Sequence, residues 1–193
     1  MIETAEDVLE ETLSDEDVRA FTAFYETDFG RMVRNDELAA GQSEPGFRAR
    51  ALAKAKDLET DPDRRGILRE IDQAILSTET AVSANVAFMR ILTVAIIQAQ
   101  GRDPSEFLGL INADIEKRKP GIRRSIAQSQ LGAFGLFYQN LDEDELRRLL
   151  AFVKSDAGQA VYSGVLAAVH QFFETAGERI GTDFGAYLAQ KKI

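Results

Sequence analysis

Residues 13–35 of the chain read LSDEDVRAFTAFYETDFGRMVRN, and residues 141–163 read LDEDELRRLLAFVKSDAGQAVYS. The two stretches align without a gap. Many of the aligned residues are identical, among them the pair Gly30/Gly158, and many others are close replacements. An internal repeat of this length constrains the architecture strongly, but it does not identify a reaction.

Each copy of the repeat predicts a helix, a sharp corner and a second helix. Ser14 and Asp142 are the expected N-caps of the first helices, because carboxylates come directly after them and favour the positive end of a helix dipole. The corners begin at Thr27 and Ser155, whose hydroxyl groups suit the N-cap of the next helix. The glycine that ends each corner is expected to let the preceding helix pack closely, since it has no side chain.

This pattern resembles a known signature. An acidic cap, a Leu/Phe-rich helix ending in Ala-Phe, and then Ser/Thr-Asp-x-Gly are similar to a bacterial family of unknown function, DUF2059. Residues 141–163 match the signature best, and residues 13–35 match more loosely, with Arg31 where Gln is usual. The resemblance implies an all-helical protein, usually exported by Gram-negative bacteria, without an established activity. It brings no catalytic residues.

The predicted fold class is all-α. No run of alternating apolar and polar residues flanked by turn residues indicates a strand. We expect a compact helical bundle in which two helix–turn–helix pseudo-repeats surround a long central helix. The whole chain, 1–193, is predicted to be one domain, with pseudo-repeats over about 13–58 and 141–190 and central helices over about 62–140.

Two central helices have predicted ends. Asp61-Pro62 is a good N-cap and first-turn pair, and the helix that it begins is expected to reach Gln100 before Gly101 ends it. Lys119-Pro120 is expected to end or kink the next helix. Residues 81–100 contain Asn85, Arg90, Gln98 and Gln100, so we expect no transmembrane segment.

The longest predicted helix carries an apolar seam with alternating steps of four and three residues, typical of a heptad repeat. The seam residues are Ile71, Ile75, Thr78, Val82, Asn85, Met89, Leu92 and Ile96. One interpretation is the central helix of an intramolecular bundle. The other is a homodimer seam in which Asn85 fixes the register.

Residues 131–139, LGAFGLFYQ, are the best candidate for a ligand pocket. Phe134, Phe137 and Tyr138 are bulky, while Gly132 and Gly135 leave space beside them, so the segment suits either an apolar ligand or a crossing helix in the core. Directly upstream lies a basic cluster, Lys117-Arg-Lys-Pro-Gly-Ile-Arg-Arg124. It suits either an anionic head group or a solvated corner.

No catalytic, cofactor or metal constellation is recognisable. The chain has no cysteine and one histidine, His170, which excludes thiolate chemistry and a site built from several histidines. The net charge of −9 argues against nucleic acid as the main partner. The acidic residues within 1–17 lack the spacing of a calcium loop and are expected to form a solvated helix face.

The sequence supports three functional hypotheses. The first is a non-enzymatic protein of the bacterial envelope that acts by protein–protein contact. The second is a carrier or sensor of an apolar ligand near Phe134–Tyr138, and the third is a helical enzyme of unfamiliar type. The start MIETAEDVLEE has no secretory leader, so we expect either an exported protein without its leader or a cytoplasmic one. The family resemblance favours the periplasm.

Overall fold

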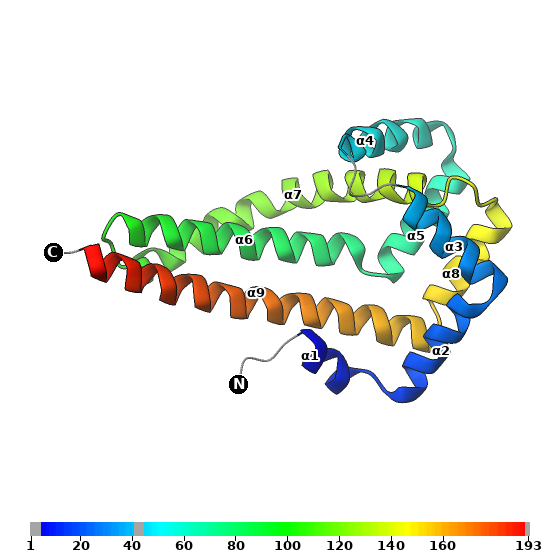
Figure 1. Ribbon diagram of the computed structural model, residues 1–193. Helices are drawn as coiled ribbons and strands as arrows, with labels where there is room; N and C mark the ends of the chain where they lie inside the picture. The colour runs from blue at the N-terminus through cyan, green and yellow to red at the C-terminus, as the bar shows by residue number, and fades with distance from the viewer. Residues whose placement is uncertain (1–4, 41–44, 192–193) are drawn as a thin grey trace.

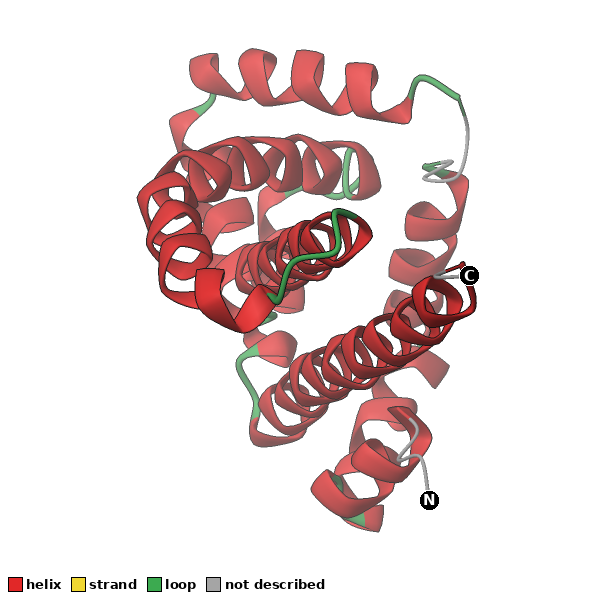
Figure 2. Ribbon diagram, turned by 90° about the vertical axis from the view of Figure 1, so that its left-hand side faces the viewer, coloured by secondary structure: helices red, strands yellow, loops and turns green. Residues whose placement is uncertain are grey.

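The structure is a computed structural model that describes residues 5–40 and 45–191. Every regular element within those residues is a helix, as Figure 2 shows, which confirms the all-α prediction. The α-helices are α1 (Ala5–Thr12), α2 (Asp15–Glu26), α3 (Asp28–Ala39), α4 (Phe47–Asp57), α5 (Pro62–Ala74), α6 (Ser77–Ala99), α7 (Leu108–Phe137), α8 (Glu143–Val153) and α9 (Asp156–Lys191). Short 3-10 helices, η1 (Leu58–Thr60) and η2 (Pro104–Phe107), precede α5 and α7.

The helices form a body at one end and a long arm (Figure 1). Helices α2, α3, α5 and α8 gather in the body, and α6, α7 and α9 run side by side along the arm, with α6 packed against both neighbours. Helix α4 lies along α7, and α1 lies along α9. The arm therefore extends well beyond the body, and only the part of α6 near the body is enclosed.

The two copies of the repeat adopt the same local structure. Ser14 is the N-cap of α2 and Asp142 is the N-cap of α8, and each forms a reciprocal capping box. At the first corner the Thr27 hydroxyl accepts from the amide of Gly30 and donates to the carbonyl of Phe24. The Ser155 hydroxyl makes the equivalent pair of bonds at the second corner. The helices that leave the corners differ in length, since α3 has 12 residues and α9 has 36.

The corner glycines touch the backbone of the preceding helix. A Cβ atom added at Gly30 would lie 2.1 Å from the Phe24 carbonyl oxygen. At Gly158 it would lie 2.6 Å from the Phe152 carbonyl oxygen. Both distances are shorter than any real carbon–oxygen contact, so the close packing predicted for these glycines is present in both copies.

Equivalent residues of the two copies meet in space. The rings of Phe24 and Phe152 stack with their centroids 3.5 Å apart and an interplanar angle of 5°. Phe21 and Tyr25 pack around Phe152, with centroid distances of 5.4 Å and 5.9 Å. Burial of this much aromatic surface joins the corners more firmly than polar contacts at the surface would.

One hydrophobic core cluster draws on both copies and on the central helices. Its buried members are Phe29, Val33, Leu58, Ile67, Leu68, Ile71, Leu131, Phe134, Tyr138, Leu141, Leu146, Leu149, Leu150 and Val153. Arg64 helps to close the body, because its guanidinium donates to the backbone carbonyls of Tyr138 and Leu141 beyond the end of α7. The Tyr138 carbonyl also accepts from the backbone amide of Leu141, so the charged Arg64 donor adds a second bond there and fixes the chain between α7 and α8.

The predicted continuous helix over 62–100 is wrong. It is broken between α5 and α6 at Leu76, which has φ 57° and ψ 24°, in the left-handed region. The Asp72 side chain accepts from the backbone amide of Thr78, so it caps the first turn of α6 and stabilises a new helix start. Sequence periodicity missed the break because the apolar spacing continues across it.

The structure shows no helix end at Pro120, and the alternative, a kink at this residue, stays a prediction. Helix α7 runs for 30 residues with Pro120 inside it. Residues 116–121 are all exposed. Water can therefore bind the carbonyl whose backbone partner the proline removes.

Helix α6 is more apolar than expected. Within the described residues it is the one helix long and apolar enough to cross a membrane, by length and composition over Ser77–Gln98. Length and composition do not by themselves show a membrane span, so the expectation of no transmembrane segment stays a prediction. Only 6% of its most apolar stretch is buried, whereas the core helix of a soluble protein is mostly buried. Helix α6 thus leaves much of its apolar surface uncovered.

The close contacts of the corner glycines predict that even a methyl group at these positions destabilises the fold. We expect Gly158→Ala to lower the free energy of unfolding by about 1–3 kcal/mol, because the added Cβ meets backbone atoms that cannot rotate away. Gly66→Ala on α5 is the matched control. Nothing lies within 4 Å of its added Cβ, and alanine is the better helix former by roughly 0.5–1 kcal/mol. Urea unfolding of both variants checks this, and equal stability of Gly158→Ala and the wild type would contradict it.

Candidate functional site

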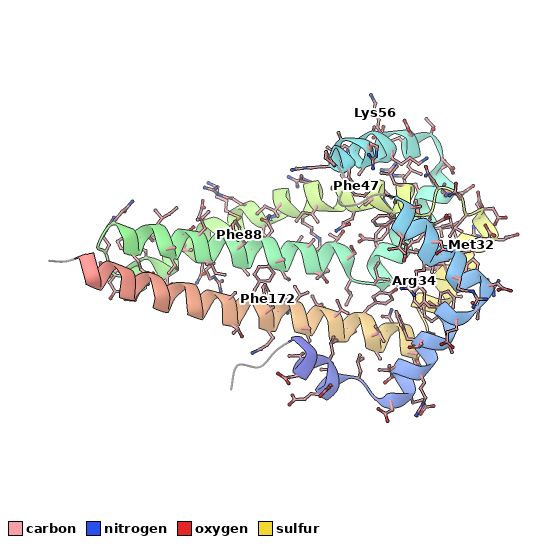
Figure 3. All side chains as sticks on the ribbon, in the orientation of Figure 1. Met32, Arg34, Phe47, Lys56, Phe88 and Phe172 are labelled. Atoms are coloured by element: carbon pink, nitrogen blue, oxygen red, sulfur yellow. The ribbon has the colours of Figure 1, made fainter. Side chains whose placement is uncertain are left out.

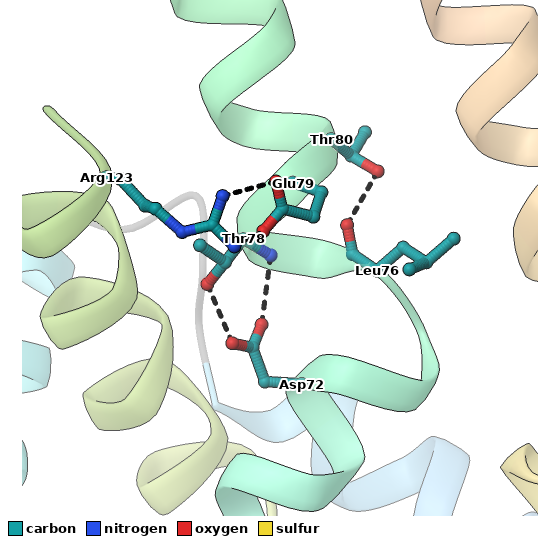
Figure 4. Close-up of polar contacts among 6 residues, drawn as sticks. All are labelled: Asp72, Leu76, Thr78, Glu79, Thr80 and Arg123. Atoms are coloured by element: carbon teal, nitrogen blue, oxygen red, sulfur yellow. Dashed lines mark hydrogen bonds and ion pairs between the residues drawn. The ribbon is translucent and has the colours of Figure 1, made fainter. Parts of the chain in front are cut away.

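The junction between α5 and α6 carries a polar network (Figure 4). One Asp72 oxygen accepts from the Thr78 amide at 2.9 Å, and the other accepts from the Thr78 hydroxyl at 2.7 Å. The Thr80 hydroxyl donates to the Leu76 carbonyl at 2.8 Å. These bonds hold Leu76 in its left-handed conformation, which is strained for a side chain of this size.

The carboxylates of this network differ in environment. Burial raises the pKa of Asp72, and the hydrogen bonds from Thr78 oppose that rise. Glu79 forms a two-point ion pair with Arg123 of α7, in which Nη1 lies 2.8 Å from Oε2 and Nη2 contacts Oε1. This pair joins the first turn of α6 to the middle of α7.

A cavity of about 430 Å³ borders the junction. Its walls come from α4, η1, α5, α6 and α7. Four arginines line it: Arg65 and Arg69 from α5, and Arg123 and Arg124 from α7. Its carboxylates are Glu59, Asp72 and Glu79. The cavity thus combines several cations with an apolar wall that includes Leu76 and Leu131.

A second polar cluster lies between the copies of the repeat. The Tyr138 hydroxyl donates to Glu37 of α3 at 2.7 Å. Burial raises the pKa of Glu37, and the bond from Tyr138 opposes that rise. Burial also raises the pKa values of Tyr25, Tyr138 and Tyr162, and the nearby Glu37 charge adds to each rise. Tyrosines from three parts of the chain therefore surround one partly desolvated carboxyl.

A wide, open groove of about 750 Å³ lies where the two corners meet. Its lining residues are Glu16, Asp17, Ala20, Ala23, Phe24, Thr27, Phe152, Ser155, Asp156 and Ala157. The hydroxyl groups of Thr27 and Ser155 are already engaged in the corner hydrogen bonds. The corner motif therefore acts in packing.

The residues of the predicted apolar pocket lie in the body. Phe134 and Tyr138 belong to the core cluster, and Phe137 packs against it and stacks with Phe47 of α4. A Cβ atom at Gly132 would lie 1.8 Å from the Ala51 carbonyl oxygen, so this glycine admits α4 as a crossing helix. Neither cavity described above is lined by these aromatic residues.

The other residues singled out from the sequence lie apart. His170 is exposed on α9. Within the described part of the chain, no three His, Cys, Asp or Glu side chains are grouped as they would be to hold a metal ion. The acidic stretch 1–17 begins outside the described residues, and Asp15, Glu16 and Asp17 form the first turn of α2.

A comparison with protein families gives one match. A family model described as "Uncharacterized protein conserved in bacteria (DUF2059)" matches residues 1–56. The resemblance to DUF2059 is confirmed. The match spans the first copy of the repeat and most of α4, whereas residues 141–163 had been expected to match best. Comparisons with curated proteins and with solved structures found no match.

Sequence reasoning did not find the arginine-lined cavity as a site. Arg123 and Arg124 stand out in the sequence as part of the basic cluster, but Arg65 and Arg69 resemble ordinary polar positions of a long helix. The spacing of Arg65 and Arg69 is one helical turn, which places them on one face of α5. The break at Leu76 turns the chain back, so that this face of α5 borders the same cavity as α7.

The buried carboxyl gives a pH-dependent prediction. Because the pKa of Glu37 is raised from 4.5 on folding, the folded protein retains a proton that the unfolded chain has released, and stability falls as the pH rises above that value. Glu37→Gln keeps an acceptor for Tyr138 and removes the charge. We expect its melting temperature to exceed that of the wild type at pH ~7 and to match it at pH ~4.

The control for this prediction is Glu26→Gln, because Glu26 is exposed on α2. We expect this control to melt like the wild type at both pH values. A Glu37→Gln protein that is less stable than the wild type at pH ~7 would show that the charged carboxylate is favourable in the cluster.

Proposed function

We propose that this protein acts in the bacterial envelope by protein–protein contact, without catalysis, and that a second copy of the chain binds the far part of α6. The envelope location rests on the resemblance to a family that is usually exported. The contact surface rests on the seam residues and on their unequal burial along α6.

From Thr78 onward the seam lies on one face of α6, and that face has two environments. Near the body, Thr78 is 6% exposed and Val82 is 2% exposed. Farther along the arm, Leu92 and Ile96 are each 50% exposed. Apolar residues that keep their heptad spacing while exposed to water favour a partner helix on that face.

Neighbouring side chains enlarge the apolar surface. Phe88 on α6 is 57% exposed, and Phe172 on α9 is 60% exposed. Both lie partway along the arm (Figure 3). Exposed aromatic side chains are frequent anchors of protein interfaces, since each removes a large apolar area from water on binding.

A second copy suits this surface for two reasons. Between Thr80 and Gln100 the only charged residue of the sequence is Arg90, so the net negative charge of the chain is located away from the far part of the seam. Asn85 is exposed within the seam, where a polar residue can pair with its twin across a two-fold axis and fix the register.

Membrane insertion is the competing role for so apolar a helix. It would require α6 to leave α7 and α9 and would place the Glu79–Arg123 ion pair at or below the bilayer surface. The energy lost from those contacts argues for a protein partner. The test includes vesicles for this reason.

Light scattering during size-exclusion chromatography tests the proposal. We expect the wild type to elute at twice the chain mass of 21.4 kDa at ~100 µM, and Leu92→Glu to raise the dissociation constant at least ~10-fold by placing a charge in the seam. Leu38→Glu is the control, because Leu38 is 71% exposed on α3, in the body. It should leave the dimer intact.

Two results would overturn the proposal. One is a wild-type monomer at ~100 µM. The other is stable association of the wild-type chain with vesicles of neutral phospholipid that is lost in Leu92→Glu, since the apolar face would then bind lipid.

A further inference from the structure

We infer that the cavity at the α5–α6 junction binds a small ligand that carries a phosphate group, and that Arg65, Arg69 and Arg124 hold it. This inference is independent of the proposed self-association, because the cavity and the far part of α6 share no residue. It rests on the pairing state of the arginines, on the size of the cavity and on the nature of its walls.

The arginines fall into two classes. Arg123 is neutralised by its two-point ion pair with Glu79. The guanidinium groups of Arg65, Arg69 and Arg124 form no ion pair or hydrogen bond with any described residue. In a chain of net charge −9, carboxylates are abundant, so three unpaired guanidinium groups around one cavity are unusual.

Arg65 supplies a more specific sign. Its Nε atom is buried without a hydrogen-bond partner. A buried donor without a partner costs about 1–3 kcal/mol, and few such groups occur in native proteins. An anionic oxygen in the cavity would supply the missing acceptor.

The carboxylates of the cavity do not neutralise its unpaired arginines. Glu79 is held by Arg123, and both Asp72 oxygens accept from Thr78. Glu59 is the one carboxylate of the cavity without a partner among the described residues, and it is exposed on η1, as Arg69 is on α5 and Arg124 is on α7, so water screens all three charges. The unpaired positive charge therefore exceeds the unpaired negative charge at this site.

The geometry of guanidinium favours a phosphate. Its planar donors match phosphate or carboxylate oxygens in pairs. Three unpaired guanidinium groups suit the charge of about −1.5 to −2 on a phosphate monoester better than the single charge of a carboxylate. The site therefore favours the phosphate.

The cavity is large enough for a phosphate group together with a small organic group. Its volume of about 430 Å³ lies within the range of small-molecule sites. Ala55, Leu76, Ala127 and Leu131 form its apolar wall. The strained Leu76 thus borders the ligand, as strained residues often do at binding sites. We assign a phosphate monoester or diphosphate with a small organic group.

Isothermal titration of the full chain at constant ionic strength tests the site with three probes. These are inorganic pyrophosphate, a nucleoside monophosphate, and phosphatidic acid in phosphatidylcholine vesicles. We expect binding of at least one probe, weakened ~10-fold or more in Arg69→Gln/Arg124→Gln. Binding of the soluble probes identifies a free phosphate ligand, and binding of the vesicles alone identifies a lipid head group.

The control is Arg118→Gln, which removes one positive charge, where the double variant removes two, from an exposed position of α7 outside the cavity. It should change the affinity less than ~2-fold, because screened surface charge contributes little. Thermal unfolding establishes that each variant folds. The inference fails if no probe binds at up to ~10 mM, or if the double variant binds as tightly as the wild type. It also fails if Arg118→Gln loses as much affinity as the double variant.

Discussion

The contact between the two corners, centred on the stacked rings of Phe24 and Phe152, is the constraint on which the rest of the structure depends. Each ring comes from the last turn of a helix. The backbone carbonyl of the same phenylalanine also lies against the corner glycine and accepts from the corner hydroxyl. The angle between successive helices is therefore set by backbone contact, and the two angles are set relative to one another by the aromatic stack. Helices α3 and α9 then leave the corners in fixed directions.

That constraint produces the division into body and arm. The α9 helix is three times as long as α3, so it extends past the body and carries α6 and α7 alongside it. Where the body covers α6, the seam is part of the protein interior. Where the arm continues alone, the same seam faces water, and apolar burial within the chain is incomplete. An interaction between copies would complete it.

How far the sequence could predict this structure depends on the range of each interaction. The caps, the corners and the close packing of Gly30 and Gly158 were predictable, because they involve residues a few positions apart. The break at Leu76 was not, because the apolar spacing continues through it and the Asp72 cap of Thr78 has no strong signature. The arginine cavity was missed for a different reason, since α5 and α7 meet only after the chain has folded back.

By itself the sequence determined the all-α class, the two helix–corner–helix units and the apolar character of α6, since helix periodicity and capping are local properties of the chain. Only the tertiary structure decided which part of the seam is buried, where Phe134 and Tyr138 lie, and which arginines face a common cavity. These properties depend on contacts between residues far apart in the sequence. The corner contact decides which of those contacts form, because it fixes the directions of the helices that leave it.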